Sequence, residues 1–174
     1  MGIRYYAYAF DRNDTEQALA NPRDFLSDDP LADAWGLPHG FTVAHGLYEQ
    51  AVPKCDMLYL DKAWRYFQLV TSPPSPEHTS RAAYRMFEGN VTFADPLTGY
   101  DRWVRPIPPD DVVEIALDLN KITPEQFAGL LRPHIDNWHV KEEDIDYAVS
   151  YLPRAQEYMT GLVETDRGFV YTIG

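Results

Sequence analysis

The chain has 174 residues, 45% of them hydrophobic and 24% charged, and a formal net charge of −12. This length and composition predict one globular domain, residues 1–174. The excess of carboxylates argues against nucleic acid or an anionic membrane as a partner, because both are bound through clustered Lys and Arg.

The single cysteine, Cys55, excludes an internal disulfide and a framework of metal-binding thiols. It precedes Asp56, whose carboxylate disfavours a thiolate, so we expect a buried structural thiol. The N-terminus shows no basic region followed by an apolar run, and no stretch approaches the roughly 18 apolar residues of a membrane span. We therefore expect a cytoplasmic protein.

The first third of the chain predicts one strand followed by short helices. Residues 3–10 are aromatic and almost uncharged, which favours a strand that is buried on both faces or lies at the centre of a sheet. Short helices are expected over residues 14–20 and 22–26 and after Asp28-Asp29-Pro30. Residues 36–46 contain three glycines and one proline and predict a loop. His39 and His45 in this loop lack the spacing of metal ligands, so we predict neither a metal nor a cofactor.

Residues 57–71 carry bulky apolar groups at helical spacing, namely Leu60, Ala63, Trp64, Phe67 and Val70. Asp56 or Asp61 can cap the first turn, and the prolines after Ser72 end the helix. We expect this segment to be the central core helix, with Trp64 packed at the hub of the fold.

Past an exposed loop at residues 71–81 and a turn at Gly89, the pattern predicts an extended segment over residues 103–107. A helix from Asp110 has an expected inward stripe of Val112, Val113, Ala116, Leu117 and Leu119. Thr123 begins another helix with a capping box, and Phe127, Leu130 and Leu131 are expected to face inward. The last helix covers residues 142–164, with a kink or a break at Pro153, and residues 169–173 form a final strand.

Three ordered stretches resemble the YfbM-like family of uncharacterised bacterial proteins. They read LDKAWRYFQLVT, PPDDVVEIALDLNKITPEQF and YLPRAQEYMTGLVETDRGFVYTIG. The resemblance covers residues 57–174 and the first ten residues, whereas residues 11–56 depart from the family pattern, so that any site built from them would be particular to this branch. It implies a compact α+β domain and no established activity. The expected architecture is a small mixed sheet that includes the N- and C-terminal strands, packed with several helices.

Two interpretations remain open for the candidate binding residues Asp61, Lys62, Trp64, Glu88 and Tyr151. In the functional one, Asp61 and Trp64 lie on one side of a helix and line a pocket. In the structural one, Asp61 caps the helix, Lys62 faces water and Trp64 packs in the core. Nucleophile-elbow, Walker and Rossmann patterns are absent from the sequence.

The sequence thus favours a non-catalytic domain that binds a protein partner or a small molecule. One version is an immunity-type protein, whose acidic surface pairs with a basic toxin. The alternative is a small enzyme with a pocket near Asp61, Trp64, Glu88 and Tyr151.

Overall fold

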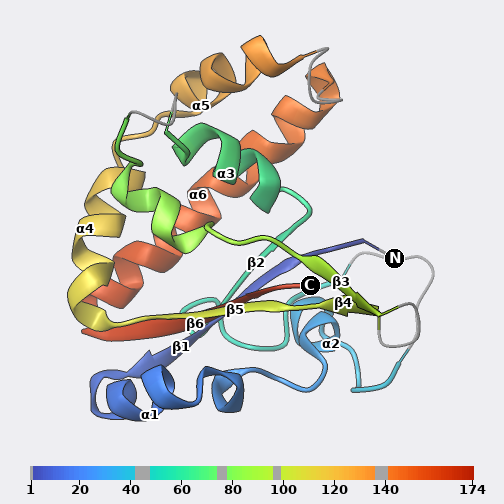
Figure 1. Ribbon diagram of the computed structural model, residues 1–174, viewed down its shortest axis with the longest axis vertical. Helices are drawn as coiled ribbons and strands as arrows, with labels where there is room; N and C mark the ends of the chain where they lie inside the picture. The colour runs from blue at the N-terminus through green and yellow to red at the C-terminus, as the bar shows by residue number, and fades with distance from the viewer. Residues whose placement is uncertain (1, 42–47, 74–77, 96–98, 136–140) are drawn as a thin grey trace.

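The computed structural model describes residues 2–41, 48–73, 78–95, 99–135 and 141–174. Four strands form an antiparallel sheet in the order β2-β1-β6-β5 (Figure 1). Their bounds are β1 Tyr5–Asp11, β2 Met57–Asp61, β5 Trp103–Ile107 and β6 Arg167–Ile173. The α+β architecture with both terminal strands in the sheet is confirmed. The pairing is antiparallel throughout, where a mixed sheet was expected.

Helices cover both faces of this sheet (Figure 1). One face carries the longer helices: α3 Trp64–Thr71, α4 Pro109–Leu119, α5 Pro124–Leu131 and α6 Glu142–Glu164. The other face carries α1 Thr15–Ala20 and α2 Pro30–Trp35. Short 3-10 helices are η1 Arg12–Asp14, η2 Pro22–Phe25, η3 Ala82–Met86 and η4 Arg132–His134. A separate ribbon pairs β3 Thr92–Asp95 with β4 Gly99–Asp101.

Strand β1 is buried on both faces, as its sequence predicts. Tyr5 and Ala7 belong to the main core under α3–α6, whereas Tyr6 and Tyr8 pack with α2 and Phe10 packs near α1. Successive side chains of a strand point to opposite faces, so an uninterrupted apolar run serves two cores. This strand joins the two layers of helices.

The expected core helix over residues 57–71 is wrong in its first third, because Met57–Asp61 is the edge strand β2. Leu58 faces the main core and Tyr59 faces α2, which is the alternation of a strand. The helix α3 begins only at Trp64, whose side chain is half-buried against the main core. Ala63, not an aspartate, occupies the N-cap position, and it supplies no side-chain hydrogen bond.

Helices α4 and α5 lie where the apolar pattern of the sequence predicts them. Fewer of their apolar side chains are buried than expected. Val113 and Leu117 are 46% and 61% exposed, and Ile115 is buried in their place. Leu130 of α5 is likewise exposed. The capping box formed by Thr123 and the side chain of Gln126 is confirmed.

Helix α6 runs from Glu142 to Glu164 without interruption at Pro153, where a kink or a second helix was expected. Pro153 is exposed, and the carbonyl four residues before it, that of Val149, has no amide partner at this position. Within the described ranges, no helix combines the length and the apolar character required to cross a bilayer.

Candidate functional site

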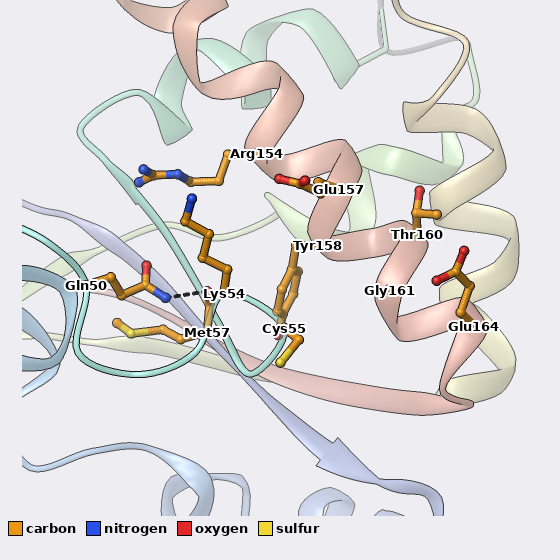
Figure 2. A pocket seen from close by; sticks show the side chains of 10 residues that line it. All are labelled: Gln50, Lys54, Cys55, Met57, Arg154, Glu157, Tyr158, Thr160, Gly161 and Glu164. Atoms are coloured by element: carbon orange, nitrogen blue, oxygen red, sulfur yellow. Dashed lines mark hydrogen bonds between the residues drawn. The ribbon is translucent and has the colours of Figure 1, made fainter.

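A cavity of about 600 Å³ lies between the second half of α6 and the segment that leads into β2 (Figure 2). The segment contributes Lys54, Cys55 and Met57, and α6 contributes Arg154, Tyr158 and Gly161 among others. Small-molecule sites in proteins have volumes of roughly 300–1,000 Å³. This cavity is therefore large enough for a ligand, and we call it the α6 cavity.

A tight turn holds the segment side of the α6 cavity. The carbonyl of Pro53 accepts hydrogen bonds from the amides of Asp56 at 2.9 Å and Met57 at 3.1 Å. The side chain of Gln50 donates to the carbonyls of Val52 at 2.8 Å and Met57 at 3.1 Å. These bonds close the loop on itself and leave the residues at its tip turned toward α6 (Figure 2).

The same segment is fastened to α2. The amide of Ala51 donates to the carbonyl of Asp33 at 2.9 Å. Gly36 ends α2 in the left-handed conformation, with φ of 64°, and a Cβ at this position would overlap the carbonyl oxygen of Glu49. Only glycine satisfies both conditions without strain, so Gly36 helps to set the position of the segment.

On the other side, the lining residues of α6 share one face of the helix. Arg154, Glu157, Tyr158 and Gly161 follow the spacing of three and four residues that places side chains one above another. A Cβ at Gly161 would meet no atom within 4 Å, so the cavity has open space at this position.

Met57 and Tyr158 form the apolar floor of the cavity and are only 2% and 3% exposed. The Tyr158 ring packs edge-on against Phe169, with 6.0 Å between the ring centroids. Its hydroxyl is buried and has no hydrogen-bond partner. Burial raises the pKa of Tyr158 well above its ordinary value, so the phenol stays neutral. The hydroxyl is thus an unpaired polar group buried behind the cavity wall.

Two cations, Lys54 and Arg154, extend toward the same end of the cavity (Figure 2). Within the described part of the chain neither forms an ion pair, and the Arg154 guanidinium lies 5.9 Å from the centroid of the Tyr151 ring. Several other arginines have carboxylate partners, such as Arg81 with Asp118 at 2.9 Å. One end of the cavity therefore carries two cations that form no ion pair in the described part of the chain, although Glu157 and Glu164 also line the cavity.

Cys55 is exposed at the edge of the cavity, close to the Tyr158 ring (Figure 2). The expectation of a buried structural thiol is wrong, because the Pro53–Met57 turn places this residue at its tip. Its thiol is accessible to reagents in solution.

The residues selected from the sequence lie elsewhere. Asp61 accepts hydrogen bonds from Arg4 Nε at 2.8 Å and from the Tyr147 hydroxyl at 2.9 Å, and is not a helix cap. Tyr151 packs edge-on against the Tyr147 ring, with 5.2 Å between centroids. Trp64 Nε1 donates to the carbonyl of Ile3 at 3.3 Å. Asp61, Trp64 and Tyr151 thus gather around the N-terminal segment.

The remaining two candidates differ in position. The Lys62 side chain lies against Gly2, beside the same N-terminal segment. Glu88 pairs with Arg105 of β5, at the opposite edge of the sheet from β2. The structure therefore brings Asp61, Lys62, Trp64 and Tyr151 into one region and keeps Glu88 apart from them.

Asp61 is held in a polar cluster with neutral tyrosines. Burial, and then the hydrogen bond to Asp61, raises the pKa of Tyr147. Burial followed by the charge of Asp61 raises the pKa of Tyr59. The Asp61 carboxylate is occupied by Arg4 and Tyr147, which is the arrangement of a structural anchor between β2, α6 and the N-terminal segment.

His39 forms a contact of 3.0 Å from its Nε2 to Asp33 Oδ1, and Asp33 also accepts from the Tyr8 hydroxyl at 2.9 Å. The bond to Asp33 raises the pKa of His39. His45 lies outside the described residues. Among those that are described, no three His, Cys, Asp or Glu side chains are grouped as metal ligands.

Comparison with known proteins identifies no relative of this chain. No protein-family model, curated protein or solved structure matches the chain.

Sequence reasoning missed Lys54, Cys55, Arg154 and Tyr158 as members of one site. Tyr158 is the only one with a local signal, since a tyrosine in an otherwise aliphatic buried stripe needs a partner for its hydroxyl. The cations are distant in sequence, and nothing in either segment indicates that they converge.

Proposed function

We propose that the protein is a non-catalytic, cytoplasmic binding domain, related to the YfbM-like family, and that the α6 cavity is its small-ligand site. The observation that carries this proposal is the cavity itself, about 600 Å³ in volume with a buried apolar floor. Ligand sites typically combine such a floor with a few polar groups that orient the ligand. Lys54 and Arg154 are groups of this kind.

The hydrogen bonds around the cavity support binding rather than catalysis. Those formed by Gln50 and by the Thr160 hydroxyl as donors go to backbone carbonyls. Among the lining residues, all of which are described, no side chain is hydrogen-bonded to another as a nucleophile is to its base. Such a pair is the usual mark of covalent or acid–base catalysis.

The experiment is to fill the cavity with a side chain from α6. Gly161→Leu places an isobutyl group in open space, and leucine is the better helix former by about 1 kcal/mol. Gly129→Leu is the matched control, because Gly129 is an exposed helical position of α5 where a Cβ also meets no atom within 4 Å. Both variants are expected to fold at least as stably as the wild type.

The measurement is the small-molecule content of each purified protein, released by denaturation and analysed by mass spectrometry. The wild type and Gly129→Leu are expected to release a common compound that is absent from Gly161→Leu. The proposal fails if the three proteins release the same compounds in the same amounts.

A second candidate, an immunity-type domain that binds a protein, is favoured by the exposed face of α4. Val113 and Leu117 lie one turn apart and are 46% and 61% exposed. The side chains of Asp110 and Glu114 on the same helix are 81% and 73% exposed. Apolar groups flanked by carboxylates suit a partner with a basic surface, which the charge of −12 would attract.

This candidate is tested by capture of partners on the immobilised protein, with identification by mass spectrometry. The double variant Val113→Lys/Leu117→Lys is expected to lose a basic partner that the wild type retains at low salt and releases at high salt. Leu130→Lys, at an exposed position of α5, is the control and should retain it. A partner retained equally by all three proteins, or none at low salt, would argue against this candidate.

A further inference from the structure

We propose that the ligand of the α6 cavity is a small apolar molecule with one carboxylate or phosphate group, bound by Lys54 and Arg154. The inference rests on the proposed function, because it specifies the ligand chemistry of the same site. It is drawn from the charges at one end of the cavity and from the apolar surface at its floor.

The charges point to an anion. The protein has 27 Asp and Glu against 15 Lys and Arg, so carboxylates outnumber its cations. Lys54 and Arg154 extend toward the same end of the cavity, without an ion pair in the described part of the chain (Figure 2). Two like charges that converge repel each other, and an anionic group placed between them removes the repulsion and gains charge-assisted hydrogen bonds.

The neighbouring carboxylates limit the charge of the ligand. Glu157 lies one turn along α6 from Arg154, and Glu164 lines the far end of the cavity. Neither forms an ion pair with Lys54 or Arg154. They leave the two cations free, yet they would repel a ligand with several negative groups, so a single anionic group fits this arrangement best.

The floor indicates an apolar body. Met57 and the Tyr158 ring form a surface away from the cations, and both side chains are almost completely buried. Met57 and Tyr158 expose almost none of their own surface, but the lining of the cavity as a whole is more apolar than polar, so an apolar group that covers it displaces water, which favours binding. The Tyr158 hydroxyl is itself buried and not exposed to the cavity, so the ligand is expected to meet the edge of the ring and not the hydroxyl.

A pair of fluorescent probes, one anionic and one neutral, measures how much a negative group contributes to binding affinity. 8-Anilinonaphthalene-1-sulfonate and N-phenyl-1-naphthylamine share one aromatic body, and only the first carries a negative group. The anionic probe is expected to bind about tenfold more tightly, and added salt should reduce this difference. Gly161→Leu should abolish its binding.

Substitutions of Lys54 and Arg154 test whether these two cations bind the anionic group of the probe. Lys54→Gln and Arg154→Gln are each expected to weaken binding of the anionic probe about tenfold and to leave the neutral probe unchanged. Lys121→Gln and Arg132→Gln change the net charge equally at exposed positions outside the cavity and should have no effect.

The single cysteine supplies an independent measurement. Because Cys55 is exposed and lines the cavity, an occupied cavity should slow its alkylation by N-ethylmaleimide, followed by mass spectrometry. Protection by decanoate alone would assign the ligand to carboxylates, and protection by decyl phosphate alone to phosphates. Decyltrimethylammonium should not protect.

The outcomes distinguish this inference from the proposed function. Equal affinity for the two fluorescent probes, or variants at Lys54 and Arg154 that bind like their controls, would overturn the anionic ligand and leave the cavity as a binding site. Binding that persists in Gly161→Leu, or no binding of either probe and no protection of Cys55, would overturn both.

Discussion

The backbones of Arg4 and Gly174 are joined by two hydrogen bonds, from the Arg4 amide to the Gly174 carbonyl at 3.1 Å and from the Gly174 amide to the Arg4 carbonyl at 3.0 Å. They extend the pairing of β1 with β6, whose last matched residues are Tyr5 and Ile173. Because β1 and β6 are the two inner strands, the end of the chain is part of the core of the sheet.

Ile173→Ala is therefore expected to be strongly destabilising. Ile173 is fully buried and pairs with Tyr5 on one side and Trp103 on the other. Loss of its side chain should lower the free energy of unfolding by about 2–4 kcal/mol, measured by urea denaturation. Leu117→Ala on the exposed face of α4 is the control and should change it by less than about 0.5 kcal/mol. Equal effects would contradict the placement of the C-terminal strand.

Tyr158→Phe and Tyr171→Phe are expected to change the free energy of unfolding in opposite directions. The Tyr158 hydroxyl is buried without a partner, so its removal should leave stability unchanged or raise it by up to about 1 kcal/mol. The Tyr171 hydroxyl donates to the carbonyl of Glu88 at 2.6 Å, and its removal should cost about 1–2 kcal/mol. Thermal unfolding monitored by circular dichroism compares the two. A large loss in Tyr158→Phe would show that its hydroxyl has a partner.

Substitutions of Asp61 separate its backbone role from its charge. Its φ of 47° is the left-handed conformation that Asn tolerates and Ala does not. Asp61→Asn should lower the free energy of unfolding by about 1 kcal/mol, since one acceptor oxygen remains for Arg4 or Tyr147. Asp61→Ala should cost about 2–3 kcal/mol, because both donors lose their acceptor and the backbone is strained. The two variants unfolding at the same urea concentration would refute this ranking.

The ion pair between Asp118 and Arg81 predicts a dependence of stability on pH. Burial acts to raise the pKa of Asp118, but the hydrogen bonds from Arg81 and from the Ala83 amide outweigh it and lower the pKa below 3.8. A lowered folded-state pKa means that the stabilisation is present above the unfolded-state pKa and is lost as the pH falls through the folded-state value.

Asp118→Asn should accordingly be less stable than the wild type by about 1–2 kcal/mol near pH 7, and the difference should shrink at about pH 2. Urea denaturation at both pH values measures it. Glu49→Gln, at an exposed position, is expected to match the wild type at both. A difference for Asp118→Asn that is the same at both pH values would rule out the ion pair as its cause.

The edge strand β2 shows where a local pattern is insufficient. Over the five residues Met57–Asp61, an apolar run fits a strand or a helix equally well. Hydrogen bonding to β1 decides for the strand, with Tyr6 opposite Tyr59 and Ala7 opposite Leu58. This partner is distant in sequence, so no window around residue 57 contains the deciding information.

The error in the predicted buried face of α4 has a different cause. Apolar residues occur on two sides of this helix, and the expected stripe combined them. Contact with the core selects the side with Val112, Ile115 and Leu119 and leaves Val113 and Leu117 exposed. Composition could identify the helix, but only the neighbouring elements determine which side is buried.

By itself the sequence determined what depends on nearby residues: the terminal strands, the starts of α4, α5 and α6, and the capping box at Thr123. Caps, prolines and apolar periodicity act within a turn or two, so their effect can be read along the chain. Only the tertiary structure decided that β2 is a strand, that Asp61 pairs with Arg4, and that Lys54 and Arg154 meet at one cavity. These relations join segments through space, and their energies come from partners that the local sequence does not name.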